Sequence, residues 1–307
     1  EWNNEAINAF RDRISDMAKS NYFGFDINPD LVKATKMNMV MNNDGSGNIL
    51  QTNSLLPPHE WTDEFRTKLA EALGVEKSEL RNHNTIAYFD VIVTNPPFSL
   101  FREFVAWVME ADKSLVIIGS QTAINYKEIF PLLKTNKLWI GATNNGKDMV
   151  FEVPEGAEVA PKDREKAAKL GYVGNYTRLG NACWFTNINH GRRHEPLQLM
   201  TMADNLKFSK HKQIRENGYQ KYDNYDAIDI PFTHAIPSDY EGVMGVPITF
   251  MDKYCPEQFE IVGMASGNSR ATGFYYNVPY TPHPEDRGGV GVINNQRQYA
   301  RILIKKR

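Results

Sequence analysis

Residues 90–98 read DVIVTNPPF, an apolar run that leads directly into Asn-Pro-Pro-Phe. The side-chain oxygen of Asn95 and the backbone carbonyl of Pro96 can each accept a hydrogen from one exocyclic amino group. The lone pair of such a nitrogen, N6 of adenine for example, is delocalised into the ring, so the nitrogen is a poor nucleophile. Two acceptors localise the lone pair and offset the charge that develops in the transition state. The motif therefore predicts methylation of an amino nitrogen.

The rest of the motif fits the same chemistry. Pro96 and Pro97 restrict the backbone, so the Pro96 carbonyl is held in place before the reaction. The ring of Phe98 can stack on a base that has been rotated out of a duplex. An ordinary strand that ends in a Pro-containing turn is the alternative. However, residues 91–93 are apolar like a fully buried parallel strand, and ligands of such sheets bind at strand carboxyl ends, so the context favours catalysis.

The elements that must position this motif alternate between helix and strand up to about residue 140, which favours a parallel sheet. We expect helices at 4–19, 29–41, 99–111 and 126–134, strands at 22–25, 49–51, 90–94, 115–119 and 138–140, and an inserted polar helix and loop at 62–84. The predicted class is α/β with a doubly wound, Rossmann-like sheet.

Beyond residue 140 the pattern is irregular. Short strands at 183–186, 259–264 and 301–305 are separated by loops rich in Gly and Pro, which predicts a C-terminal α+β region. Residues 155–180 are charged and contain Gly, so we expect an exposed, mobile loop there. The expected domains are 1–200, catalytic, and 201–307, a region that recognises the target.

Composition indicates an intracellular enzyme. Two cysteines in 307 residues give no disulfide framework, and no run of about eighteen apolar residues is present to span a membrane. The amino end, EWNNEAINAF, lacks the basic and apolar parts of a signal peptide, so a cytoplasmic location is expected. The histidines show no metal-ligand spacing with the cysteines, and we expect no metal.

The formal net charge of −2 is unusual for a protein that contacts DNA phosphates, but the distribution of charge is more informative than the sum. Basic residues gather at 192–194, at 207–221 and at the carboxyl end. The residues that we expect to contact DNA are Arg192, Arg193, Lys207, Lys210, Lys212, Arg215, Lys221 and Tyr222. A solvated helix face explains any single basic residue equally well, and the tyrosines near 219–225 equally suit an internal interface.

Asp26 follows the strand expected at 22–25, and two readings of it are open. An acidic residue at the end of the second strand of a nucleotide-binding sheet accepts hydrogen bonds from both ribose hydroxyls of a cofactor. Asp is also a common helix cap, and a helix is expected to begin near Pro29. Ile27 is a candidate for the wall of the adenine pocket by position alone.

Most of the chain resembles the EcoRI-type adenine-specific DNA methyltransferases. The stretches that carry the resemblance are NPPFSLFREFV (95–105), LVIIGSQTAINYKEIFPLLK (115–134), WFTNINHGRRHE (184–195), KYDNYDAI (221–228), GVMGVPITFMDKYCPEQFEIVG (242–263) and YARILIKK (299–306). Residues 23–61 are instead similar to the M subunits of type I restriction-modification systems, which share the NPPF motif. Both a natural mosaic and an engineered chimera would give such a joint.

The resemblance implies transfer of a methyl group from S-adenosylmethionine to N6 of an adenine flipped out of duplex DNA, without a covalent enzyme intermediate. It assigns the ribose role to Asp26. Asn53 stands where many related enzymes have an Asp that hydrogen-bonds the adenine of the cofactor, and its side-chain oxygen can accept the same bond. The EcoRI type implies a monomer beside a restriction endonuclease, whereas the type I part implies a specificity subunit. We favour the longer, EcoRI-type match.

One family element is missing. Methyltransferases of this fold usually open with a strand and a Gly-rich turn, which would precede the helix at 4–19. Three explanations are open: an incomplete amino end, which we favour, a pocket completed by another chain, and a protein that keeps DNA binding without catalysis. An N4-cytosine methyltransferase and a protein glutamine methyltransferase remain alternatives, although the first more often has Ser in place of Asn95 and the second needs no long basic C-terminal part.

Overall fold

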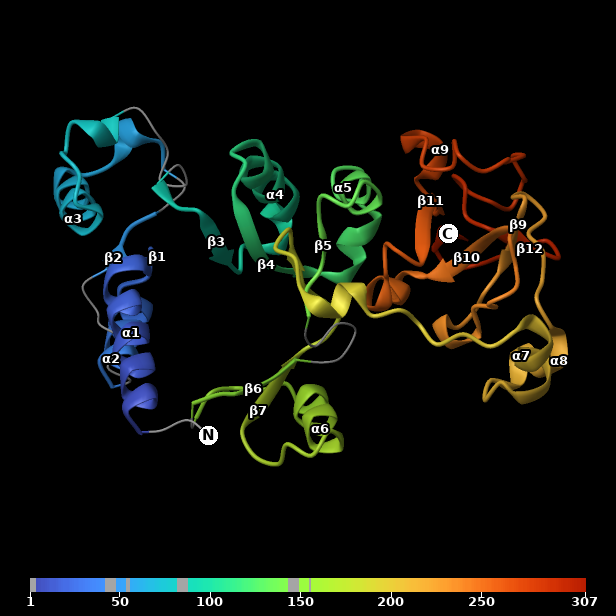
Figure 1. Cartoon of the computed structure of the whole chain (residues 1–307), viewed down its shortest axis with the longest axis horizontal. Coiled ribbons are helices and arrows are strands. Elements are labelled where there is room, and N and C mark those ends of the chain that lie inside the picture. Colours follow the sequence, from blue (N-terminus) through green and yellow to red (C-terminus); the bar gives the residue numbers. More distant parts are fainter. Residues whose placement is uncertain (1–3, 42–47, 54–55, 82–87, 143–148, 155) are drawn as a thin grey trace. The chain divides into compact units, whose positions relative to one another are not determined.

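The computed structural model describes residues 4–41, 48–53, 56–81, 88–142, 149–154 and 156–307. The chain divides into two compact units, Glu1–Asp90 and Val91–Arg307 (Figure 1). This division differs from the boundary expected near residue 200, because residues on either side of 200 pack together. For example, Lys134 Nζ donates to the Val262 carbonyl at 2.9 Å. The assignment of 1–200 and 201–307 therefore stays a prediction about function.

The first unit contains a pair of parallel strands. β1 (Gly24–Asp26) pairs with β2 (Ile49–Gln51), and Asp26 lies opposite Gln51. α1 (Asn4–Asn21) precedes β1, and α2 (Pro29–Met41) lies between the two strands in the chain. The expected helices and strands of this segment are confirmed, with shifts of at most two residues at their ends.

The core of the first unit is built on the segment that was expected to be a polar insertion. α3 (Asp63–Leu73) begins where the Thr62 side chain accepts a hydrogen bond from the backbone N–H of Phe65, and it ends at Gly74, whose φ is 67°. Phe65 and Leu69 lie one helical turn apart and are buried together with Trp61, Leu50, Ala70 and Leu80. The helix was predicted, but its contribution to the core was not.

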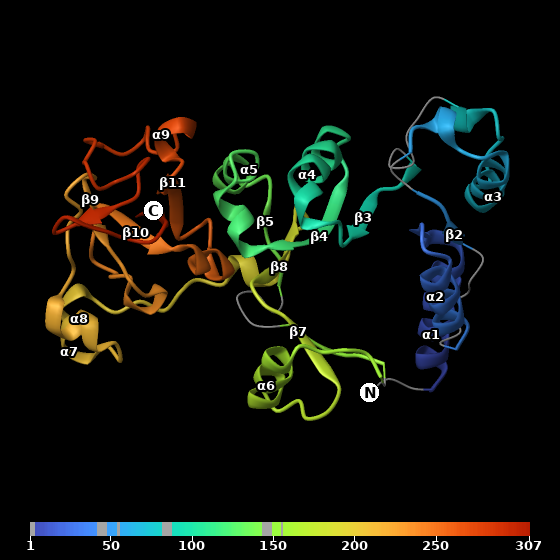
Figure 2. The ribbon, with the colours of Figure 1, turned by 180° about the vertical axis from the view of Figure 1, so that it is seen from behind.

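The second unit begins with the sheet that carries the Asn-Pro-Pro-Phe motif. Its strands lie in the order β3 (Val91–Thr94), β4 (Ser114–Ser120), β8 (Ala182–Thr186) and β5 (Trp139–Ile140), as Figure 2 shows from behind. β3 and β4 are parallel, while β8 is antiparallel to both of its neighbours. The expectation of one doubly wound parallel sheet is not confirmed: β1–β2 and β3–β4 are parallel pairs within their own units, and β8 runs antiparallel to its neighbours.

α4 (Phe101–Glu110) follows the motif and packs on β4. Its Phe101, Val105 and Val108 are buried, and the rings of Phe101 and Phe185 are 5.0 Å apart. Gly119 of β4 allows the Phe101 ring to pack against the strand, because a Cβ at this position would lie 2.3 Å from the ring. α5 (Phe130–Lys134) is shorter than the helix expected at 126–134, because residues 126–129 form a bend and a turn after a 3₁₀ segment at 121–125.

The described residues of the segment 155–180 are largely exposed, as expected, but they contain a helix and a strand and not only a loop. β6 (Met149–Glu152) and β7 (Tyr176–Leu179) form an antiparallel pair, and α6 (Pro161–Lys169) lies between them in the chain. Proline at the first helical position and the Lys, Glu and Ala residues after it favour a helix. Arg178 of β7 donates to Asp163 of α6 at 3.1 Å, which ties the helix to the strand pair.

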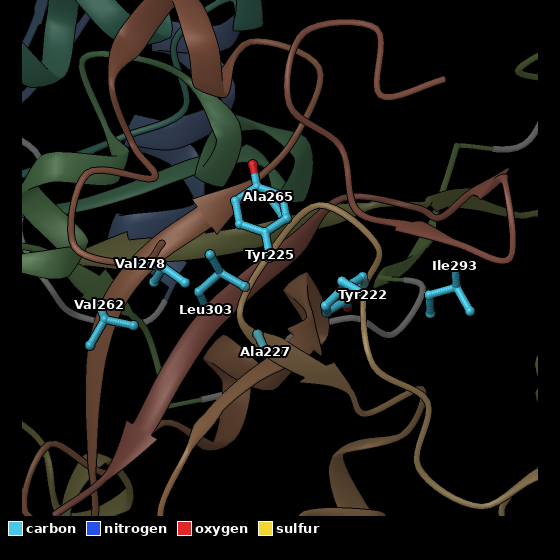
Figure 3. Packing of buried hydrophobic residues seen from close by; sticks show 8 residues of the cluster. All are labelled: Tyr222, Tyr225, Ala227, Val262, Ala265, Val278, Ile293 and Leu303. Atoms are coloured by element: carbon cyan, nitrogen blue, oxygen red, sulfur yellow. The ribbon is translucent and has the colours of Figure 1, made fainter. Parts of the chain in front are cut away.

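A second sheet contains the C-terminal strands. The strands lie in the order β11 (Phe259–Ala265), β14 (Arg301–Lys306), β10 (Val243–Pro247) and β9 (Ala227–Asp229), and the remaining elements are α7 (Met202–Phe208), α8 (Lys212–Asn217), α9 (Ser269–Thr272), β12 (Val292–Ile293) and β13 (Gln296–Arg297). Its core includes Tyr222, Tyr225 and Leu303 (Figure 3). Among the described helices, none is long and apolar enough to cross a membrane.

A buried ion pair joins two strands of this sheet. Arg301 Nε of β14 donates to Asp229 Oδ1 of β9 at 2.9 Å, and both side chains are less than one tenth exposed. The hydroxyl of Tyr222 donates to the same carboxylate at 2.5 Å. Burial raises the pKa of Tyr222 well above its ordinary value, so the phenol is kept as a neutral donor.

Candidate active site

The Asn-Pro-Pro-Phe motif lies where the sequence predicted it, at the carboxyl end of β3, but β3 is not the fully buried strand that we expected, since Val91 and Val93 are 48% and 68% exposed. Pro96 is buried, whereas Asn95 is exposed and Phe98 is 39% exposed. The backbone N–H of Leu100 donates to the Pro97 carbonyl at 2.9 Å, which closes a 3₁₀ turn before α4. The Asn95 side chain makes no hydrogen bond with another described residue. Its oxygen is therefore available to a ligand, and the buried proline beside it fixes the backbone.

The neighbouring strand supplies polar groups that the sequence reasoning missed. Thr94 pairs with Ile117, so the parallel strand β4 ends at Ser120 on the same edge of the sheet as the motif. Ser120 Oγ lies 2.7 Å from Thr122 Oγ1, and Asn181 Nδ2 donates to Ser120 Oγ at 3.4 Å. The sequence does contain a signal for these groups, because polar residues follow the apolar run 115–118 just as they follow the apolar run 91–93.

Asp26 lies at the carboxyl end of β1. Its Oδ1 accepts a hydrogen bond from the backbone N–H of Asn28 at 2.7 Å. Asn28 in turn accepts one from the N–H of Asp30 at 2.9 Å, so Asn28 caps α2. The reading of Asp26 as the helix cap is therefore wrong. The second carboxylate oxygen of Asp26 has no hydrogen-bond partner among the described residues, and the side chain is only half-buried.

The other cofactor candidates lie near Asp26. β1 and β2 are parallel with Asp26 opposite Gln51, so Asp26 and Asn53 follow the carboxyl ends of neighbouring strands. Asn53 is half-buried, and its carbonyl accepts from the N–H of Leu56 at 3.2 Å. The Ile27 side chain is 69% exposed. These residues belong to the first unit and the Asn-Pro-Pro-Phe motif belongs to the second.

Arg192 and Arg193 are engaged inside the protein. Arg192 donates to both carboxylate oxygens of Asp252, at 2.8 and 2.9 Å, and to the Ala142 carbonyl at 2.6 Å. The Arg193 guanidinium lies 4.0 Å from the centre of the Trp139 ring and donates to Asn136 at 2.6 Å. Burial lowers the pKa of Arg193. Both arginines thus connect the region after β8 to elements distant in the sequence.

The basic residues of 207–221 are mostly exposed. Lys207, Lys210, Lys212 and Arg215 lie on or between α7 and α8. Lys212 pairs with Glu216 at 3.4 Å and Lys221 with Asp226 at 2.8 Å, and all four of these side chains are more than half exposed. Exposed ion pairs of this kind contribute little to stability, so these cations can exchange partners with anions in solution.

Tyr222 is a correction to the expected DNA contacts. Its side chain is 4% exposed and packs in the C-terminal core, where its hydroxyl is held by Asp229. Polar and aromatic residues alternate around Tyr222, and this pattern does not indicate which of the rings are buried. The sequence left open whether these tyrosines pack inside the protein. Tyr222 does so, and so does Tyr225, which is 2% exposed.

Metal binding and attack by a cysteine nucleophile are two other kinds of chemistry to consider for the described part of the chain. No group of three or more His, Cys, Asp or Glu side chains there is arranged to hold a metal ion. Cys183 and Cys255 are free and buried. Burial raises the pKa of the Cys183 thiol to about 12, so this thiol is protonated near neutral pH and is a weak nucleophile.

Comparison with known proteins places these residues in context. The family described as "Adenine-specific methyltransferase EcoRI" matches residues 58–307. The match includes the Asn-Pro-Pro-Phe motif and leaves residues 1–57 outside, so the likeness of 23–61 to type I M subunits stays a prediction. No solved structure matches the chain.

Three curated relatives are similar over more than half of the chain. Type II methyltransferase M.EcoRI of Escherichia coli is 42% identical over 179 residues, which are 58% of this chain and 51% of the relative. Type II methyltransferases M.MgeORF184P of Mycoplasma genitalium and M.MpnI of Mycoplasma pneumoniae are 35% and 34% identical over 71% of this chain and 64% of each relative. The chain therefore spans about half to two thirds of the length of these relatives.

Proposed function

The chain belongs to the EcoRI family of adenine-specific methyltransferases, and from this premise we propose that it methylates N6 of an adenine in duplex DNA within a restriction-modification system. The observation that carries the proposal is the Asn-Pro-Pro-Phe motif at the carboxyl end of β3, inside the matched region. Asn95 is exposed there without a side-chain partner among the described residues, and Pro96 is buried.

The proposed chemistry uses two acceptors and one ring. Asn95 Oδ1 and the Pro96 carbonyl each accept one hydrogen of the adenine amino group, which makes the nitrogen lone pair available for attack. Phe98, which is 39% exposed, stacks on the flipped base and keeps it in line. We propose that Ser120, Thr122 and Asn181 form the neighbouring wall of the base pocket, because they lie at the same edge of the sheet.

The methyl donor that fits this reaction is S-adenosylmethionine, whose sulfonium supplies an electrophilic methyl group when it is bound. The residues of the first unit suit its nucleoside part. Asp26 keeps one carboxylate oxygen for the ribose hydroxyls, and Asn53, at the end of the adjacent parallel strand, offers an acceptor to the adenine amino group. Ile27 presents an exposed apolar side chain for the adenine ring.

Asp26→Ala is expected to weaken binding of S-adenosylmethionine at least tenfold, since hydrogen bonds to a charged group contribute roughly 1.5–3 kcal/mol. Isothermal titration calorimetry of the full chain measures the effect. Asp30→Ala is a matched control, because Asp30 is an exposed acid on the first turn of α2 and has no role in the proposed pocket. Equal affinity in all three proteins would show that Asp26 does not hold the cofactor.

The DNA surface in this proposal is the exposed basic segment around α7 and α8. Lys207, Lys210, Lys212, Arg215 and Lys221 contact phosphates, whereas Arg192 and Arg193 hold the region after β8 in position through Asp252 and Trp139. The relatives are named Type II methyltransferases, and we propose that this chain likewise works beside a separate restriction endonuclease and not with a specificity subunit.

The proposed reaction is tested by its product. The chain is incubated with S-adenosylmethionine and unmethylated duplex DNA, and the DNA is digested to nucleosides that are identified by mass spectrometry. N6-methyladenine is expected. N4-methylcytosine as the product, or no methylated nucleoside while S-adenosylmethionine is bound, would contradict the proposal.

A further inference from the structure

A short β-hairpin projects polar side chains from the C-terminal region. β12 (Val292–Ile293) and β13 (Gln296–Arg297) are antiparallel, with Val292 opposite Arg297 and Ile293 opposite Gln296. The connecting residues Asn294 and Asn295 have φ values of 50° and 60°. A two-residue turn with positive φ at both positions favours Asn followed by Gly. Asn295 therefore keeps an amide side chain at a position where the backbone itself favours glycine.

The base of this hairpin is fixed in the protein core. Val292 and Ile293 are no more than 5% exposed, and Ile293 packs in the cluster that contains Tyr222 (Figure 3). The buried amide of Asn224 accepts from the Val292 N–H at 2.9 Å and donates to the Val290 carbonyl at 2.8 Å. These contacts hold the hairpin in one orientation.

A further bond fixes the turn itself. The Asp223 carboxylate accepts from the backbone N–H of Asn295 at 3.0 Å. This bond holds the Asp223 side chain against the turn. Hydrogen bonds within the protein thus hold the backbone of the hairpin.

The side chains at the tip of the hairpin, unlike its backbone, are not held by hydrogen bonds with the rest of the described chain. Asn294, Asn295, Gln296 and Arg297 are exposed, and Tyr299 is 86% exposed. None of these side chains forms a hydrogen bond or an ion pair with another residue in the part of the chain that the structure describes. Two Asn, one Gln and one Arg thus follow one another at the tip of the hairpin, and their side-chain donors and acceptors are exposed to solvent.

We propose that the β12–β13 tip enters the major groove of the target duplex and reads base edges, which deepens the function proposed above and rests on it. The major groove admits a two-stranded β-ribbon, and its edges match these side chains. The amides of Asn295 and Gln296 can pair with N6 and N7 of adenine, and the Arg297 guanidinium can pair with O6 and N7 of guanine. The hairpin thereby selects the sequence, while the lysines of α7 and α8 bind phosphates.

The test compares sequence preference with overall affinity. The unsubstituted chain and the variants Asn295→Gly, Gln296→Ala and Arg297→Ala each select duplexes from a pool with a randomised segment, and bound DNA is sequenced. Asn295→Gly removes the amide but suits the turn, so its melting temperature should not fall. Lys210→Ala is the matched control, since loss of a phosphate contact weakens binding about equally for all sequences and lowers the salt slope by about 1.

Each hairpin variant is expected to lose preference at one or two positions of the selected sequence, with an affinity for the preferred duplex lower by about ten- to hundredfold. Lys210→Ala should keep the same preferred sequence. An unchanged preference in all three hairpin variants would overturn the hairpin proposal and leave the proposed function intact. Failure of the unsubstituted chain to bind any duplex would overturn the proposed function, and the hairpin proposal with it.

Discussion

Asn95→Ala is expected to lower the rate of DNA methylation by about 10²–10³, the loss typical of removing one preorganised group that stabilises developing charge. Asn95 is exposed at the end of β3, and its side chain is not committed to another described residue. Removal of its oxygen leaves the amino nitrogen with the Pro96 carbonyl as its single acceptor. The substitution deletes no buried group, so the fold should be unaffected.

The rate is best measured in single turnover with radiolabelled S-adenosylmethionine, because product release then does not mask the chemical step. Affinities for cofactor and for duplex DNA are measured in parallel and should change little. Asn277→Ala is a matched control, since Asn277 is also exposed in the second unit and has no proposed role in the reaction. Methylation by Asn95→Ala at the unsubstituted rate would remove Asn95 from the mechanism.

Arg301→Ala is expected to reduce the free energy of unfolding by about 3–5 kcal/mol, because it leaves the Asp229 carboxylate buried without its cation. Asp229 and Arg301 are 6% and 8% exposed, and the 2.9 Å hydrogen bond between them joins β9 to β14. Tyr222 would still donate to Asp229, but a neutral phenol does not compensate a buried charge.

Urea denaturation measures this loss. Lys305→Ala on the same strand is the control and should change stability by less than about 0.5 kcal/mol, since Lys305 is exposed. The triple variant Tyr222→Phe, Asp229→Leu, Arg301→Leu should recover much of the loss, because it replaces the buried ion pair and also removes the phenol hydroxyl that would otherwise lose its acceptor. A single variant as stable as the unsubstituted chain would show that water or a rearranged neighbour satisfies Asp229.

Much of the local structure follows from the sequence. The strand that ends at Thr94, the parallel pair β1–β2 and the start of α2 at Pro29 were predictable because apolar runs, helical spacing and proline act over a few residues. The same local chemistry led to the prediction of Asn95, Pro96 and Phe98 as catalytic residues, which stays a prediction. The position of Asp26 was predictable too, but the assignment of the helix cap to Asn28 required the hydrogen bonds.

The direction of strands and the composition of each sheet were not predictable in the same way. β8 has the same apolar character as a parallel strand, and its pattern would be unchanged if the chain ran the other way. The expected loop at 155–180 contains α6 because the strand pair β6–β7 gives the helix a surface and Arg178 gives Asp163 a partner. Such support comes from residues brought close only by folding.

The sequence by itself predicted the proposed chemistry, since the acceptors, prolines and ring that the proposed reaction needs are adjacent in the chain. Only the tertiary structure decided which polar side chains stay exposed and could contact the DNA that we propose as substrate. Arg192 is paired with Asp252, sixty residues away, and Tyr222 is buried beside Asp229 and Arg301, while Asn295 and Arg297 remain exposed on a hairpin. The physical reason is that burial and pairing depend on partners distant in the sequence, whereas residue type and spacing are local properties.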